Sequence, residues 1–208
     1  MDAAARFLAA GGVVAYPTET VYGLGVDARS SAAIAALLVM KGRDEGRGIS
    51  LLVENLDAAA DLLAEPPGED ARALASRFWP GPLTIVLAAS SRVAPQVVGP
   101  SGGVGLRCSS DPWAAALVAR FGAPVTSTSA NASGCEPARS AGDVRSAFPH
   151  QASGAAPSLF VLDGGARTSS EVSTVIEFSK GRATLLREGA IRASDLASMI
   201  DLAGKNRG

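Results

Sequence analysis

Histidine and cysteine are scarce in this sequence of 208 residues, which contains one histidine, His150, and two cysteines, Cys108 and Cys135. Ser-His-Asp chemistry, Cys-His chemistry and most metal sites are therefore excluded, unless His150 alone carries them from its Pro-, Gly- and Ser-rich segment. The cysteines form no CxxC motif, which argues against a structural zinc site and against a disulfide framework. Unless His150 is that exception, catalysis is expected to rest on other residue types.

Long apolar runs are also missing. The longest, residues 32–40 and 83–89, fall well short of the roughly 20 residues that cross a bilayer, and each fits a core element. The N-terminal segment MDAAARFLAAGG has an early acid and no basic stretch ahead of an apolar one, unlike a signal peptide. We therefore expect a cytoplasmic protein with no membrane segment.

The chain has no dominant charge, because 19 Lys and Arg residues oppose 20 Asp and Glu residues for a net charge of -1. It also has only two Tyr and two Trp residues. A tight nucleic-acid binder would carry a basic field and stacking aromatic rings, so any anion site must be local. With 47% hydrophobic residues, we expect residues 1–208 to form a single domain.

Short β-type runs alternate with alanine-rich helical patterns along the chain. This alternation predicts an α/β fold, and the sequence STVIEFSKGRATLLR predicts an antiparallel hairpin closed at Lys180-Gly181, so the sheet should be mixed. Residues 134–157 are the most loop-like part. The expected strands are residues 12–17, 49–54, 83–88, 104–108, 123–129, 158–163, 173–178 and 183–187. The expected helices are residues 30–41, 68–79, 111–122 and 194–203.

The segment KGRDEGRGIS is the first of three polar candidates for ligand binding. It follows a predicted helix and places Lys41, Arg43 and Arg47 among glycines, which permit close approach of the backbone to a ligand. Lys and Arg suit phosphate or carboxylate groups. Asp44 and Glu45 could neutralise these cations, however, so an ordinary solvated turn remains an alternative.

The other two segments carry hydroxyl groups where predicted strands end. YPTETVYGLG holds Thr18 and Thr20, and VTSTSANASG holds Ser127, Ser129 and Asn131. Such side chains can hydrogen-bond a small polar ligand or a nucleotide, although capped turns and plain loops use them too. The sequence has neither the P-loop GxxxxGK[ST] nor a helix-opening GxGxxG, so a nucleotide would bind by another route.

Seven blocks, in order along the chain, resemble the YrdC-like family, the threonylcarbamoyl-AMP synthases. They are YPTETVYGLG, the KxR of Lys41 and Arg43, FWPGPLTIVL, VGLRC with Arg107, SANASG, STVIEF, and LLREGAI with Arg187. Together they cover most of the chain and are far more specific than any one block. The resemblance implies a twisted, mixed parallel and antiparallel sheet flanked by helices, with a concave ligand cleft, of the short single-domain type.

Members of this family make an activated threonine from L-threonine, bicarbonate or CO2, and ATP, and release pyrophosphate. A separate protein complex then moves the threonylcarbamoyl group onto tRNA, at the adenosine next to the anticodon. The likeness implies that ATP is contacted by Lys41, Arg43, Ser129, Asn131 and Arg187, of which Lys41 and Arg43 are catalytic. It implies a threonine pocket formed by Thr18, Arg107, Ser127 and Ser173.

Such a reaction fits the few reactive side chains of the sequence. The carbamate formed from threonine and CO2 is itself the nucleophile toward the α-phosphorus, so no Ser, Cys or His nucleophile is needed. The protein must align the reactants and neutralise the triphosphate, which Lys, Arg and backbone amides can do. We expect Mg²⁺ to arrive bound to the phosphates, without a metal site of the protein's own.

The sequence departs from the family pattern in three places. Asp44 stands where proline usually follows the KxR motif, Cys108 and Ser109 stand where a proline often follows the arginine, and Val172 replaces an acid before Ser-Thr. Two other functions remain as alternatives. One is a module that binds double-stranded RNA or tRNA, weakly at this net charge, and the other is a carbamoyl-transfer domain with a different acceptor.

Overall fold

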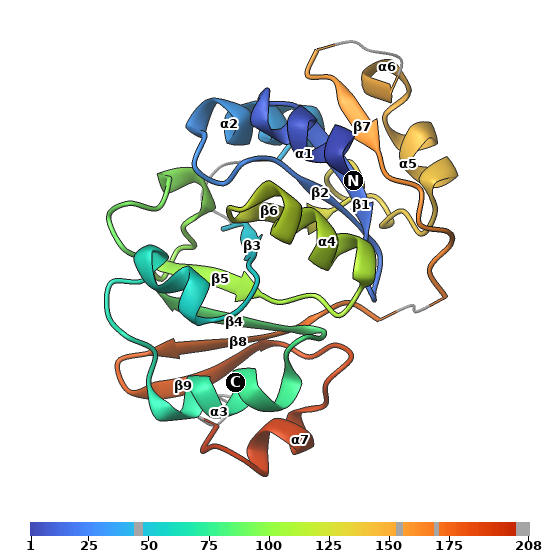
Figure 1. Cartoon of the computed structure of the whole chain (residues 1–208). Helices are drawn as coiled ribbons and strands as arrows, with labels where there is room; N and C mark the ends of the chain where they lie inside the picture. The colour runs from blue at the N-terminus through green and yellow to red at the C-terminus, as the bar shows by residue number, and fades with distance from the viewer. Residues whose placement is uncertain (44–47, 153–155, 169–170, 203–208) are drawn as a thin grey trace.

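Nine strands form one sheet in the computed structural model of this protein, which describes residues 1–43, 48–152, 156–168 and 171–202. The order across the sheet is β7-β1-β2-β6-β3-β5-β4-β8-β9. Figure 1 shows β1, β2 and β7 in the upper half of the molecule and the hairpin of β8 and β9 near the lower end. The strands are β1 (Val13–Pro17), β2 (Tyr22–Gly25), β3 (Ser50–Leu52), β4 (Leu83–Ala88), β5 (Gly103–Arg107), β6 (Val125–Ser129), β7 (Leu159–Val161), β8 (Thr174–Ser179) and β9 (Arg182–Arg187).

The sheet is mixed, as the sequence predicts. Strand pairs β1–β7, β3–β5 and β4–β8 run parallel, whereas β1–β2, β2–β6, β3–β6, β4–β5 and β8–β9 run antiparallel. The hairpin of β8 and β9 turns at Lys180 and Gly181, as expected, with φ angles of 52° and 70°. Two consecutive positive φ angles favour the tight turn of a twisted hairpin.

Helices flank the sheet, and their ends follow the capping signals of the sequence. Ser30 accepts a hydrogen bond from the backbone N–H of Ala33 at the start of α2, and Gly42 ends that helix with a φ of 58°. Asp111 caps α4, Pro112 is its first residue and Gly122 ends it. The helices are α1 (Asp2–Ala9), α2 (Ser31–Lys41), α3 (Glu69–Phe78), α4 (Pro112–Phe121), α5 (Ala141–Ala147), α6 (Pro149–Ala152) and α7 (Ala193–Ala197), with 3-10 turns at Asp57–Leu62 and Pro95–Val97.

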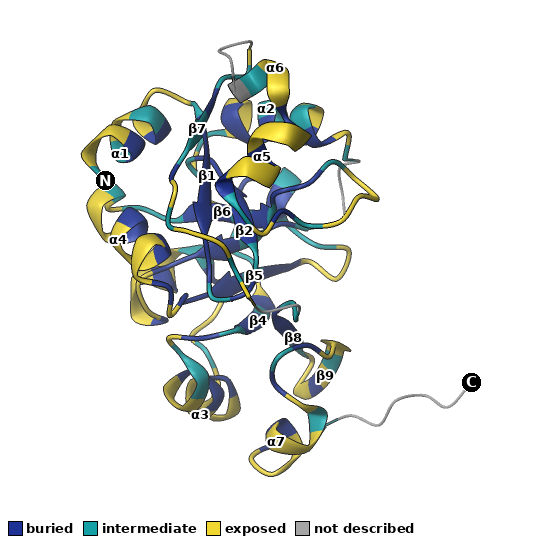
Figure 2. Ribbon diagram, turned by 90° about the vertical axis from the view of Figure 1, so that its right-hand side faces the viewer, coloured by how far each residue is buried: buried dark blue, intermediate teal, exposed yellow. Residues whose placement is uncertain are grey.

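Buried side chains form two clusters. The smaller one packs α1 and α4 against β1, through residues such as Leu8, Leu117 and Val14. The larger one joins α2, α3, α5 and α7 to the rest of the sheet. Figure 2 shows the strands largely buried along the middle of the molecule, while the helices turn exposed surfaces outward. None of the helices in the described ranges is long and apolar enough to cross a membrane.

Five elements differ from the sequence prediction: β2, α1, α5, α6 and α7. Strand β2 was not expected, because its two glycines lower the β-propensity of the segment. Only glycine fits at position 25 without a shift of its neighbours, since a Cβ there would lie 2.4 Å from a methyl group of Val125. Helix α1 was not expected either. The last helix ends at Ala197, well before residue 203, because Leu202 forms a parallel bridge to Ala183 of the sheet.

The expectation that residues 134–157 form a loop is wrong for α5 and α6. Ser140 accepts a hydrogen bond from the N–H of Asp143, and the Asp143 carboxylate accepts one from the N–H of Ser140. This reciprocal cap starts α5, and Val144 anchors the helix in the core. Residues 153–155 of this segment lie outside the described residues, and so do Asp44 and its neighbours up to position 47.

Candidate active site

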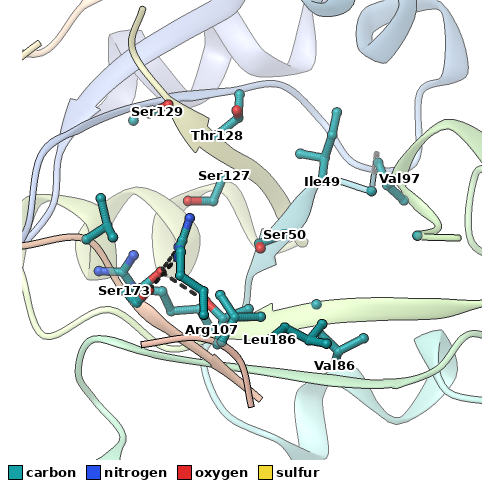
Figure 3. Close-up of a pocket in the computed structure, with 18 of the residues that line it drawn as sticks. Ile49, Ser50, Val86, Val97, Arg107, Ser127, Thr128, Ser129, Ser173 and Leu186 are labelled. Atoms are coloured by element: carbon teal, nitrogen blue, oxygen red, sulfur yellow. Dashed lines mark hydrogen bonds between the residues drawn. The ribbon is translucent and has the colours of Figure 1, made fainter. Parts of the chain in front are cut away.

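A polar cavity of about 460 Å³ opens on one face of the sheet. Seven of the nine residues predicted to bind ATP or threonine line it, and they come from segments far apart in the sequence. Figure 3 shows the hydroxyls of β6 on one side of this cavity, and Ser173 with Leu186 on the opposite side. The concave cleft expected from the sequence is therefore present. The seven lining residues are Thr18, Arg43, Arg107, Ser127, Ser129, Ser173 and Arg187.

The alternation of side chains along each strand builds this cavity. On β4, Leu83 and Ile85 enter the core, whereas Thr84 and Val86 line the cavity. On β5, Gly105 lies between two core residues, and a Cβ there would approach Ser50 Oγ to 3.1 Å. Small residues at alternate positions therefore leave room for a ligand on this face.

Arg187, from the end of β9, is fixed at the cavity wall by Ser173. Its Nε donates to the carbonyl oxygen of Ser173 at 3.0 Å, and its Nη2 donates to Ser173 Oγ at 2.9 Å. Burial lowers the pKa of the Arg187 guanidinium, and so does the nearby positive charge of Arg107. Two guanidinium groups thus face the same cavity, which makes it a receptor for anions.

Arg107 ends β5 and is paired with Glu19, from the turn between β1 and β2. Arg107 Nη2 lies 2.9 Å from Glu19 Oε1 and donates to Thr20 Oγ1 at 3.4 Å. The second carboxylate oxygen, Oε2, accepts a hydrogen bond from Ser109 Oγ. Burial raises the pKa of Glu19, but the charge of Arg107 and the Ser109 hydrogen bond outweigh it, so the pKa lies below its usual value. Glu19 is therefore ionised at neutral pH.

Arg43 reaches the cavity from the loop that follows α2. Its Nη1 donates to Thr128 Oγ1 at 3.0 Å, and its Nη2 donates to the carbonyl oxygen of Gly48 at 2.7 Å. The left-handed conformation of Gly42 turns the chain so that this arginine points toward β6. Of the KxR motif, Arg43 is the residue that lines the cavity.

Lys41 is buried and lies behind the cavity-lining residues of β6. Its Nζ donates to the carbonyl oxygens of Ser129 and Asn131, the latter at 2.7 Å. Burial and the neighbouring charge of Arg43 lower the pKa of Lys41 to about 8. Since Ser129 lines the cavity shared with Arg187, Lys41 lies at the edge of the same site, although the described lining does not include it.

Asn131 is also outside the described lining and stabilises the loop after β6. Its Nδ2 donates to the carbonyl oxygens of Ala132 and Cys135, at 2.9 and 2.6 Å. The Asn131 Oδ1 atom is buried without a hydrogen-bond partner among the described residues.

The two cysteines differ in exposure. The Cys135 thiol is exposed, whereas the Cys108 thiol is buried and donates to the carbonyl oxygen of Glu54.

The two remaining predicted residues complete the side of the cavity nearest Arg107. Thr18 Oγ1 donates to the carbonyl oxygen of Val21 at 2.7 Å and accepts from the N–H of Thr20, which shapes the turn that holds Glu19. Ser127 points from β6 toward this side (Figure 3). The four residues predicted to bind threonine, Thr18, Arg107, Ser127 and Ser173, therefore all line one cavity.

Sequence reasoning missed several lining residues. Thr20 lines the cavity, and the neighbouring Glu19 pairs with the lining residue Arg107. Both belong to the block YPTETVYGLG, but no role was assigned to the Glu19 carboxylate. Thr84, Ser50 and Gly105 belong to predicted strands, where their alternation with apolar residues was the available signal. That alternation marks a strand face that is not part of the core.

Two further observations delimit the site. A second groove, of about 910 Å³, shares Ser101, Gly103 and Glu177 with the cavity, but none of the predicted binding residues lines it in the described structure. Within the same described ranges, no group of three or more His, Cys, Asp and Glu residues could hold a metal ion. The chemistry of the cavity therefore comes from its guanidinium, ammonium and hydroxyl groups.

Fold and cavity together define an α/β protein with a receptor for an anionic, hydroxyl-bearing ligand. The model of the Sua5/YciO/YrdC family, described as "Telomere recombination", matches residues 6–189. The chain belongs to this family, which confirms the resemblance seen in the sequence. It is 46% identical over 145 residues to a threonylcarbamoyl-AMP synthase of Halorhodospira halophila, covering 70% of this chain and 75% of that protein.

Two other known proteins agree with this assignment. A threonylcarbamoyl-AMP synthase of Thiobacillus denitrificans is 38% identical over 178 residues, which cover 85% of this chain and 89% of that one. The structure of P. abyssi Sua5 complexed with L-threonine matches with a TM-score of 0.87 at 33% identity over 96% of this chain. The present chain spans 56% of that Sua5 chain.

Proposed function

We propose that this protein synthesises threonylcarbamoyl-AMP from L-threonine, bicarbonate or CO2, and ATP, for the threonylcarbamoyladenosine modification of tRNA. Membership of the family and the relatives named threonylcarbamoyl-AMP synthase support this activity. The observation that carries it is the convergence of Arg43, Arg107 and Arg187 with the β6 hydroxyls in one cavity. Such a cavity can hold a triphosphate and a small hydroxy amino acid together.

The proposed residue roles divide the cavity into two ends. Threonine is bound by Arg107, Ser127, Ser173 and Thr18. The guanidinium of Arg107 pairs with the carboxylate of the amino acid. ATP is bound by Lys41, Arg43, Ser129, Asn131 and Arg187. Two hydrogens of the Lys41 ammonium are used by carbonyl groups, and the third is directed to a phosphate oxygen.

In the proposed reaction, a carbamate oxygen of N-carboxythreonine attacks the α-phosphorus. The new P–O bond forms as the bond between the α-phosphorus and the α,β-bridging oxygen breaks, and the electron pair of that bond leaves with pyrophosphate. Lys41 and Arg43 stabilise the negative charge that builds up on the phosphates, and the cavity holds the reacting groups in line. No side chain forms a covalent intermediate.

Magnesium is proposed to enter with ATP. Glu177 is the one carboxylate among the described lining residues, and Mg²⁺ keeps several waters and takes few protein ligands when phosphates hold it. Its charge would add to that of the arginines on the triphosphate. Delivery of the product to a tRNA-modifying complex, weak RNA binding and a cytoplasmic location all stay predictions.

The test is incubation with ATP, L-threonine and bicarbonate, followed by detection of the mixed anhydride and pyrophosphate. We expect pyrophosphate only when all three substrates are present, and at least a tenfold loss of rate in Arg43→Ala, about 1.4 kcal/mol of transition-state stabilisation. Arg29→Ala, a change at an exposed arginine paired with Asp27, is the matched control and should retain the rate. Pyrophosphate release without threonine would contradict the proposal.

A further inference from the structure

A buried chain of polar contacts stands behind Arg107, and no role in the reaction has been assigned to it above. Arg107 is 6% exposed and lines the cavity. Its Nη2 is held by Glu19 and Thr20, and its Nε is buried without a partner among the described residues. One edge of the guanidinium is thus fixed from behind, and donors remain for a ligand.

Glu19 is itself held in place by Ser109. The Ser109 hydroxyl donates to Glu19 Oε2 and accepts the N–H of Asp111 at 3.2 Å. Asp111 caps α4 and also pairs with Arg167 at 2.6 Å. The position of the carboxylate therefore depends on the start of a helix, which is a rigid part of the fold.

The charge of Glu19 also matters to the site. Arg107 and Arg187 face the same cavity, and the pKa of Arg187 is lowered by burial and, to a lesser degree, by repulsion from Arg107. A buried arginine without a countercharge is costly. Glu19 balances the charge of Arg107 at 2.9 Å, so that the guanidinium stays at the cavity wall before any ligand is bound.

We propose that Glu19 and Ser109 are positioning residues, which orient the Arg107 guanidinium for the carboxylate of the amino-acid substrate. This inference rests on the proposed function. A carboxylate is recognised by an arginine fork of fixed orientation, and a preorganised fork loses less entropy on binding than a mobile one. Ser109 lies at a departure from the family pattern, where a proline could not supply the hydroxyl.

The experiment compares the binding of L-threonine, L-threonine amide and ATP to the wild type and to variants of the full chain. In Glu19→Gln, we expect the Kd for L-threonine to rise about tenfold, whereas the Kd for ATP changes less than about twofold. Because the amide lacks the carboxylate, its Kd should change little. The variant would then lose the preference of the wild type for threonine over the amide.

Three further variants separate orientation from charge and from folding. Glu19→Asp keeps the charge but is too short to hold both partners, so it should also weaken threonine binding. Ser109→Ala should do so more mildly, and Ser109→Thr should restore binding because it keeps the hydroxyl. Glu54→Gln, a matched change at an exposed carboxylate outside the cavity lining, should leave all three Kd values unchanged.

Several results would overturn the inference. Tighter threonine binding in Glu19→Gln with wild-type binding in Glu19→Asp would mean that the carboxylate acts through charge alone. Equal losses for ATP, threonine and the amide, with a lower melting temperature, would mean a purely structural role. If the wild type forms the mixed anhydride but the Glu19 and Ser109 variants bind threonine normally, the inference is wrong and the proposed function stands. If the wild type forms no mixed anhydride, the proposed function is wrong.

Discussion

Lys41 binds the backbone, and we propose that it binds ATP as well. Its amine satisfies two carbonyl groups at the end of β6, where the chain leaves the sheet. The same burial that makes these bonds strong lowers its pKa to about 8. The protonation of Lys41 therefore falls within the range of pH in which the enzyme can be assayed.

We predict that ATP binding takes up a proton above pH 8. Phosphate favours the ammonium form, whereas free Lys41 is largely neutral there, so affinity should fall by up to about tenfold per pH unit. Calorimetry at pH 9 in buffers of different ionisation enthalpy measures this uptake, and Lys41→Arg should abolish it. Since the folded state binds fewer protons than the unfolded state between about pH 8 and 10.5, the free energy of unfolding of the ligand-free protein should rise across that interval.

Ser173 connects the two ends of the cavity, because a residue assigned to threonine holds Arg187, which is assigned to ATP. We predict that Ser173→Ala raises the KM for threonine by about tenfold, the effect of one lost hydrogen bond to a polar ligand, and the KM for ATP by less. Steady-state assays with each substrate varied in turn measure both values. An equal rise in both would place Ser173 at the ATP end.

The sequence alone predicted residues that the structure brings into one cavity, but it did not predict which side chains and carbonyl groups they pair with. Hydroxyls and arginines at strand ends were recognised from seven blocks, and seven of the nine residues line one cavity. The pairing of Arg107 with Glu19, and the use of Lys41 on two carbonyls, could not be predicted. Both depend on contacts between segments about 90 residues apart, which no local pattern specifies.

At the scale of elements, helix caps were the most predictable feature and glycine-rich strands the least. The caps at Ser30 and Asp111 are local, so the sequence specifies them directly. Strand β2 exists because β1 and β6 on either side supply its hydrogen bonds. Such tertiary support overrides the low propensity of Gly23 and Gly25.

Helix α4 offers a test of how an element holds the site. Asp111 caps the helix and pairs with Arg167 while 4% exposed. We predict that Asp111→Ala lowers the free energy of unfolding by about 3–5 kcal/mol, because it leaves a largely buried arginine without its partner. Asp111→Asn keeps the cap and should cost less.

Chemical denaturation measures these differences. The matched control is Asp2→Ala. Asp2, on α1, is the exposed ion-pair partner of Arg120, on α4, and its loss should scarcely change the free energy of unfolding. If Asp111→Ala were as stable as this control, the buried pair would have no part in stability.

For the whole molecule, the single sheet supports our inference that residues 1–208 form one domain. The described lining of the cavity includes residues of β2, β3, β4, β5, β6, β8 and β9, and so reaches from the β2–β6 region to the β8–β9 hairpin. These parts lie toward opposite ends of the strand order. A ligand in the cavity therefore contacts strands that are otherwise joined only through their neighbours.

We predict that ATP and threonine together raise the melting temperature more than either alone. A ligand at 100 times its Kd adds about 2.7 kcal/mol to the free energy of unfolding, and two ligands that fill adjoining ends of one cavity should add their effects. Thermal shift assays with L-threonine, ATP and both measure this. A combined shift no larger than the greater single shift would mean that the two ligands compete for one end.

The exposed thiol of Cys135 has a practical consequence. The backbone carbonyl of Cys135 accepts a hydrogen bond from Asn131, which we propose to bind ATP, while the other cysteine of the chain, Cys108, is buried. A maleimide dye would therefore attach at one position without any mutagenesis. Its fluorescence could follow nucleotide arrival in real time, in the unaltered polypeptide.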